Sequence, residues 1–230
     1  MKSSNFSAAV MMRKIKRTFS YDNKTMLTLS INYPQIVLRR NRPVQDIVNR
    51  HIQAQVNDYY NYAANDLYQQ AVAYYKDTQE NGFPFHNYDA VLQYEITYNQ
   101  RCHFSLYRDR YEFTGGAHGN TVRASDNWNL IDGRIMPLAS LFPPGQDYQA
   151  FLIEQMIKQA DSQIQQNPGI YFEDYRALIA KNFNEKSYYL TPSGVAIYYQ
   201  QYEIAPYATG IVVFTILYNT LQWRPSCTAS

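Results

Sequence analysis

The sequence predicts an α+β fold in which antiparallel sheets pack against helices, in two subdomains. Strand-like and helix-like runs are partly segregated along the 230 residues, and hairpin-type turns join several of the strand-like runs. Hydrophobic residues make up 46% of the chain, which is enough to bury a substantial core. We therefore expect an N-terminal α+β domain over residues 14–122 and a C-terminal α+β domain over residues 123–223.

The first expected element is a pair of strands over residues 16–36. Met26, Thr28 and Ser30 alternate there with Leu27, Leu29 and Ile31, a period of two that is typical of a strand with one buried face. The Asp22-Asn23 pair before this run is suited to a tight turn.

A single long amphipathic helix is expected next. Pro43 suits its first turn, and Asn81-Gly82 suits its end. Between them, apolar residues recur every three or four positions, while the other face is rich in Asn, Gln and Asp. The apolar stripe consists of Val48, Ile52, Val56, Tyr59, Ala63, Leu67, Ala71 and Tyr74.

The middle of the chain predicts antiparallel sheet, with alternating Tyr-rich runs at 88–99 and 101–113 and a third strand-like run from 121. Asp132-Gly133 between strand-like residues is a strong signal for a two-residue hairpin. A helix is expected over 147–167, where Asn167-Pro168-Gly169 ends it, and a shorter one over 172–183. Strands at 187–191, 194–204 and 210–218 complete the prediction.

Charge is unevenly distributed, although the net charge is only +2. The first fifty residues hold ten Lys or Arg and two Asp, in two clusters, Arg13-Lys14-Lys16-Arg17 and Arg39-Arg40-Arg42. We expect the acidic remainder of the chain to neutralise them, with an anionic polymer or membrane surface as the alternative. Neither cluster lies in a nucleic-acid-binding motif, so no nucleic acid is expected as a partner.

Neither an export signal nor a transmembrane run is visible in the sequence, since AAVMM is too short for the first and IVVFTILY for the second. The prediction is a cytoplasmic protein as given, or an extracytoplasmic one if the amino end is trimmed. Cys102 and Cys227 are either free thiols or one disulfide. The position of Cys227 near the end of the chain favours free thiols, which suit a cytoplasm.

The most distinctive loop is TGGAHGNT at 114–121, yet it matches no catalytic motif. It lacks the Lys-Ser/Thr ending of a phosphate-binding loop, and the chain has no G-x-S-x-G or HExxH pattern. We expect no metal and no cofactor. Gly115, Gly116 and Gly119 are expected to adopt backbone angles that other residues resist, with the His118 ring hydrogen-bonded to neighbouring backbone. The 23 tyrosines are expected mainly at strand rims, or alternatively on a recognition surface.

Three stretches together resemble the RsiV-like family, the extracytoplasmic region of an anti-sigma factor and related domains of unknown function. They are TGGAHGNT at 114–121, NWNLIDGRIMPLASLF at 127–142, and residues 183–221 with the segment YEIAPYATG at 202–210. The similarity covers most of residues 14–223. Unlike RsiV, the sequence shows no sigma-binding region and no transmembrane helix, so sigma-factor regulation is not expected.

The resemblance implies binding rather than catalysis, and hence a protein that is not an enzyme. RsiV is a receptor for lysozyme, and a similar region accompanies the catalytic domain of a peptidoglycan deacetylase. The implied partner is a protein such as lysozyme or a peptidoglycan glycan. The alternative is a hydrolase or transferase with a diffuse site near His118, together with Glu203 or Tyr207. The expected binding residues are Gly115, Gly116, His118, Asn120, Tyr202 and Tyr207.

Overall fold

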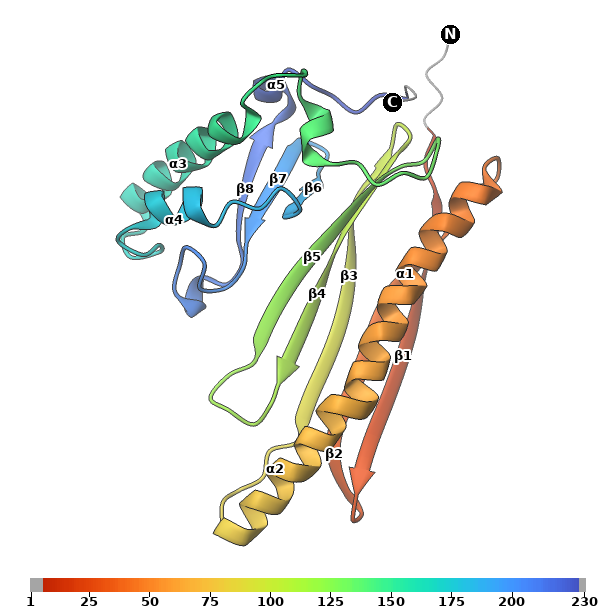
Figure 1. The fold of residues 1–230 in the computed structure, drawn as a ribbon, viewed down its shortest axis with the longest axis vertical. Helices are drawn as coiled ribbons and strands as arrows, with labels where there is room; N and C mark the ends of the chain where they lie inside the picture. Colours follow the sequence, from red (N-terminus) through yellow and green to blue (C-terminus); the bar gives the residue numbers. More distant parts are fainter. Residues whose placement is uncertain (1–5, 228–230) are drawn as a thin grey trace. The chain divides into compact units, whose positions relative to one another are not determined.

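The computed structural model describes residues 6–227 and confirms the α+β fold, with a five-stranded sheet, a three-stranded sheet and several helices (Figure 1). The chain forms two compact units. The N-terminal unit comprises residues 9–94 and 108–122, and the C-terminal unit comprises residues 6–8, 95–107 and 123–227. Residues 95–107 therefore pack with the C-terminal part of the chain, although they lie in the middle of the sequence.

The predicted first hairpin is present as β1 (Ala9–Tyr21) and β2 (Lys24–Val37), paired antiparallel. Asp22 and Asn23 take the left-handed angles φ 50° and φ 58° that a two-residue hairpin turn requires. Short polar side chains tolerate these angles better than most. β1 is an edge strand, and its thirteen residues are exposed apart from half-buried Ile15 and Phe19.

The predicted long helix is also present, but it contains a π-helical segment that the sequence analysis missed. α1 (Arg42–Tyr62) leads into a π-helical turn (Ala63–Leu67) and then α2 (Tyr68–Asn81), which ends at Gly82 with φ 70°. Tyr59, Ala63, Leu67 and Ala71 follow one another at intervals of four residues. In a regular α-helix these three intervals would rotate the side-chain direction by roughly 120° around the helix axis. The wider π turn absorbs this drift, so that Tyr59, Ala63, Leu67 and Ala71 are all buried.

One strand pair contradicts the expectation of purely antiparallel sheets. β3 (Tyr88–Gln100) pairs with β2 in parallel, with Leu27 opposite Tyr88 and Ile31 opposite Leu92. The reason is the helix between them, because it returns the chain to the end where β2 began. β4 (His103–Phe113) and β5 (Asn120–Asn129) complete the order β1-β2-β3-β4-β5.

The hairpin predicted at Asp132-Gly133 is reduced to a turn. Gly133 has φ 77°, but the chain beyond it makes only one isolated bridge, between Trp128 and Ile135, instead of a strand. The segment then enters a short 3₁₀ turn (Leu138–Leu141).

The C-terminal unit contains the predicted helices as α3 (Tyr148–Gln166) and α4 (Tyr175–Lys181). Its sheet has the antiparallel order β6-β7-β8, formed by β6 (Tyr188–Leu190), β7 (Gly194–Tyr199) and β8 (Val212–Leu217), and is followed by the short α5 (Tyr218–Leu221). Leu152 and Met156 of α3 share one core cluster with Val195 and Ile197 of β7. None of the helices described between residues 6 and 227 is long and apolar enough to cross a membrane.

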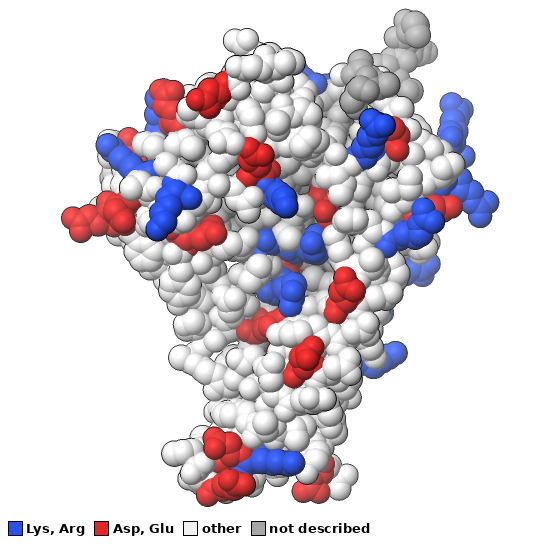
Figure 2. All heavy atoms as spheres, in the orientation of Figure 1, with Lys and Arg blue, Asp and Glu red and all other residues white. Residues whose placement is uncertain are grey.

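Several tyrosines in this unit are structural. Their rings are buried while their hydroxyls donate to backbone carbonyls, Tyr188 to Met136 at 2.6 Å and Tyr199 to Ile179 at 2.8 Å. Burial raises the pKa of both phenols, so they remain neutral donors at physiological pH. On the face shown in Figure 2, acidic and basic side chains are interspersed.

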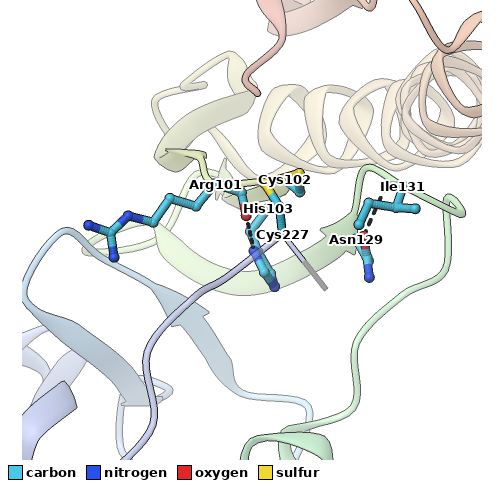
Figure 3. The surroundings of a disulfide bond; sticks show 6 residues. All are labelled: Arg101, Cys102, His103, Asn129, Ile131 and Cys227. Atoms are coloured by element: carbon cyan, nitrogen blue, oxygen red, sulfur yellow. Dashed lines mark hydrogen bonds between the residues drawn. A yellow bond between two sulfur atoms is a disulfide. The ribbon is translucent and has the colours of Figure 1, made fainter. Parts of the chain in front are cut away.

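The structure overturns the preference for free thiols, because Cys102 and Cys227 form a disulfide (Figure 3). Their Cα atoms are 5.1 Å apart although 125 residues separate them in sequence. The bond fastens the segment before Cys227 to the turn between β3 and β4, within the C-terminal unit. Arg101 and Cys102 form that turn with φ 50° and φ 63°.

Candidate functional site

The glycine-rich loop belongs to the N-terminal unit, in the connection from β4 to β5. The expectation of unusual backbone angles holds for Gly115, with φ 84°, but not for Gly116 or Gly119. Gly119 is instead required by close packing, since a Cβ there would collide with the ring of Tyr111. Space around Gly116 is open. Backbone geometry and ring packing therefore explain two of the three glycines.

His118 is exposed, and its Nδ1 lies 3.1 Å from the Gly119 carbonyl oxygen, in agreement with the predicted bond to neighbouring backbone. Asn120 is the first residue of β5.

The two tyrosines expected at the site lie in the C-terminal unit and form a pair. The ring centroids of Tyr202 and Tyr207 are 5.8 Å apart, and Tyr202 is 53% exposed with φ 67°. Between them, Glu203 accepts a hydrogen bond from the Gln200 backbone N–H at 2.7 Å. Burial raises the pKa of Glu203, and this hydrogen bond opposes the rise. The grouping of these tyrosines with the glycine loop stays a prediction, since the two loops belong to separate units.

Another site in the C-terminal unit was missed by the sequence analysis. Two cavities, of about 330 and 430 Å³, share Ser140 and Trp223 as wall residues. We call them together the Trp223 groove. The first is also lined by His103, Asn129 and Arg134, and the second by Phe142, Gln146 and Phe151. Only a structure brings these residues together, because His103 and Trp223 are 120 positions apart.

His103 supplies a hydrogen-bond acceptor to the groove. Its Nδ1 lies 2.6 Å from the Arg101 carbonyl oxygen, which can only accept, so Nδ1 carries the proton and Nε2 does not (Figure 3). Burial lowers the pKa of His103, which keeps the ring neutral at pH 7. Nε2 has no partner among the described residues. Among residues 6–227, every side-chain polar atom that is enclosed has a hydrogen-bond partner. Because Nε2 has none, it must be open to solvent.

Trp223 supplies a donor and an aromatic surface. The indole is half-buried and touches the rings of His103 and Tyr218, with centroids 6.1 and 5.8 Å away. Its N–H has no acceptor among residues 6–227 and is not enclosed. The groove therefore combines a flat apolar surface, an unused donor and an unused acceptor. Within the same range of residues, no three His, Cys, Asp or Glu side chains gather closely enough to hold a metal ion.

Comparison with family models gives two matches, one in each half of the chain. Residues 20–121 match the model described as Deacetylase PdaC, and residues 139–219 match the model of a protein of unknown function, DUF3298. Two successive stretches of the chain are thus similar to two different family models. Some residues that line the Trp223 groove, from Ser140 to Phe151, lie within the stretch that matches DUF3298, while most of them, His103 and Trp223 included, lie outside it.

Solved structures of DUF3298 family members share the fold. A member from Bacteroides fragilis superposes with a TM-score of 0.73 at 19% identity, covering 95% of this chain and 94% of that one. A second, from Pseudomonas aeruginosa, gives a TM-score of 0.60 at 16% identity, covering 96% and 94%. No curated protein matches the chain.

Proposed function

We propose that this protein is a non-enzymatic, extracytoplasmic binding protein and that its Trp223 groove holds a cell-wall glycan. The observation that carries the proposal is the indole of Trp223, half-buried between two cavities with its N–H unused. A sugar ring has an apolar face that packs on an indole, and its hydroxyls both donate and accept. Nε2 of His103 accepts from such a hydroxyl, and the Trp223 N–H donates to one.

The disulfide supports an extracytoplasmic location. Disulfides persist in oxidising compartments and are rare in a reducing cytoplasm. The Cys102–Cys227 bond also fixes the position of the segment that carries Trp223, so we expect the groove to keep its shape only while the bond is intact.

Charge favours a glycan over a cationic protein such as c-type lysozyme. Arg134 is the only charged residue among the described residues lining the groove, since His103 is neutral at pH 7. A cationic partner would meet no carboxylate there, and complementary charge is what steers and fixes charged protein partners. The RsiV-like resemblance adds support, because it connects related domains with lysozyme and with a peptidoglycan deacetylase.

Titration calorimetry with soluble peptidoglycan fragments tests this proposal, with c-type lysozyme as the second ligand and two salt concentrations to expose non-specific charge attraction. We expect saturable glycan binding that survives moderate salt and falls at least about tenfold in Trp223→Ala, a loss of about 1.4 kcal/mol. Trp223→Phe keeps an apolar ring but loses the N–H, so an intermediate affinity is expected. Phe172→Ala removes a half-buried aromatic ring of the same unit that lines neither cavity, so it serves as the matched control and should bind normally.

Two results would contradict the proposal. One is glycan binding that is unchanged in Trp223→Ala. The other is saturable, salt-resistant binding of lysozyme without any glycan binding, which would make the protein a receptor for a protein ligand instead.

A further inference from the structure

The C-terminal unit contains another cavity, of about 360 Å³, at the turn between β3 and β4. Arg101 from that turn and Arg224 from the segment before Cys227 both line it, beside Tyr98, Tyr218, Ser193 and Asn219. Its volume falls within the range of small-molecule sites. It is separate from the Trp223 groove, with which it shares no wall residue.

The two guanidinium groups lack counter-charges. Neither Arg101 nor Arg224 makes a salt bridge or side-chain hydrogen bond with any described residue, and no Asp or Glu is among the residues that line the cavity. Two other arginines, Arg110 and Arg176, are paired with Glu112 and Asp161, each at 3.1 Å. Two cations that share one cavity without an anion repel each other, so a bound anion would be stabilised by both.

Neutral donors surround the two charges. The Tyr98 hydroxyl has no hydrogen-bond partner among residues 6–227 and is not enclosed, although the ring is only 5% exposed. Burial raises the pKa of Tyr98, so its hydroxyl stays protonated and can donate. The Tyr218 hydroxyl already donates to the Thr191 carbonyl at 2.7 Å, which fixes that ring as a wall.

The fold holds Arg101 in an unfavourable backbone conformation. Arg101 and Cys102 occupy consecutive left-handed positions at the turn, where Asn and Gly are the usual residues. The disulfide accounts for the cysteine, whereas no ion pair or side-chain hydrogen bond among residues 6–227 accounts for an arginine. Its side chain extends away from the disulfide in Figure 3. The same disulfide brings Arg224 to the cavity, because Cys227 follows only three residues later.

We propose that this cavity is a binding site for the carboxylate of a small ligand, an acidic sugar or the free end of a peptide. Arg101 and Arg224 hold the carboxylate, and Tyr98 donates a hydrogen bond to it or to a neighbouring oxygen. This site does not depend on the function proposed for the Trp223 groove.

The test is titration calorimetry with two pairs of probes that differ only in charge. Glucuronate is compared with glucose, and N-acetyl-alanyl-alanine is compared with its C-terminal amide. We expect at least one acid to bind saturably below about 10 mM, with an affinity that falls as salt rises, and each neutral partner to bind more weakly than its acid. The acid that binds identifies the source of the carboxylate.

Variants assign the binding to the cavity. Arg101→Asn removes the charge and places a residue that tolerates φ 50°, so it should fold normally and bind at least about tenfold more weakly. Arg224→Gln should do the same. Lys158→Gln, on α3 and outside every cavity described, removes a positive charge elsewhere in the same unit and should leave the affinity unchanged.

The proposal is overturned if neither acid binds up to about 10 mM, if the neutral partners bind equally well, or if Arg101→Asn and Arg224→Gln keep full affinity. Binding of inorganic sulfate or phosphate without either acid would also overturn it. Loss of acid binding in Cys102→Ser/Cys227→Ser would support it, since the double variant frees the segment that carries Arg224.

Discussion

Removing the Cys102–Cys227 disulfide should destabilise the C-terminal unit by several kcal/mol. The bond closes a loop of 125 residues. In the chain-entropy model a loop of that length gives about 5 kcal/mol, while measured losses of native disulfides are commonly about 2–5 kcal/mol. We therefore expect Cys102→Ser/Cys227→Ser to lower the free energy of unfolding by about 3–5 kcal/mol.

Urea unfolding followed by tryptophan fluorescence measures this loss. Both tryptophans, Trp128 and Trp223, lie in the C-terminal unit, so their emission reports on that unit alone. With a slope of about 2 kcal/mol/M, a loss of 4 kcal/mol lowers the urea midpoint by about 2 M. The corresponding fall in melting temperature is about 10–20 °C for a chain of this size.

Reduced wild-type protein is the matched comparison. Its unfolding curve should coincide with that of the double serine variant, because both lack the covalent link while keeping similar side-chain volumes. If the oxidised and reduced wild-type proteins unfold at the same urea concentration, the bond contributes nothing and the reasoning fails. In that case the disulfide would also not be needed to position Trp223 and Arg224 for binding.

Three further predictions concern single residues. Because the pKa of His103 is lowered in the folded protein, the unfolded chain binds more protons below about pH 6.5, so the contribution of His103 to stability should be constant above that pH and fall below it. The urea midpoint should therefore change less between pH 5 and pH 7 in His103→Asn than in the wild type. An equal change in the two proteins would contradict the assignment. Gly119→Ala should cost about 1–3 kcal/mol because the new Cβ meets the ring of Tyr111, whereas Gly116→Ala, where space is open, should be nearly neutral in the same denaturation assay. Leu152→Ala in the C-terminal core should cost about 2–5 kcal/mol, and a loss below 1 kcal/mol would show that the site is less well packed than described.

Local patterns predicted most of the elements. Apolar residues recur at every second position around residue 28 and at every third or fourth position from Val48 to Tyr74. Both patterns arise because one face of the element is buried, and such patterns can be recognised in the sequence itself. The Asp22-Asn23 turn was visible because both residues favour left-handed angles. The turn at Arg101-Cys102 has the same geometry but was not identifiable, since neither residue type favours it.

Features that depend on distant segments were not predictable. The parallel pairing of β2 and β3 is decided by the direction in which the long helix returns the chain. The disulfide and the Trp223 groove each bring together residues that are more than a hundred positions apart in the sequence. The spacing of the two cysteines does not indicate whether they are bonded to each other. No sequence pattern marks His103 either, because its role depends on the hydrogen bond to the Arg101 carbonyl and on the distant Trp223.

The exposed edge strand β1 offers a physical reason for the basic character of the N-terminal residues. A thirteen-residue strand with one unpaired side is a template on which another molecule's strand can add and start aggregation. Exposed Met11 and Met12 would increase that risk, but the next positions carry Arg13, Lys14, Lys16 and Arg17. Two such edges brought together would place like charges side by side, and their repulsion would oppose polymerisation of the protein through this strand.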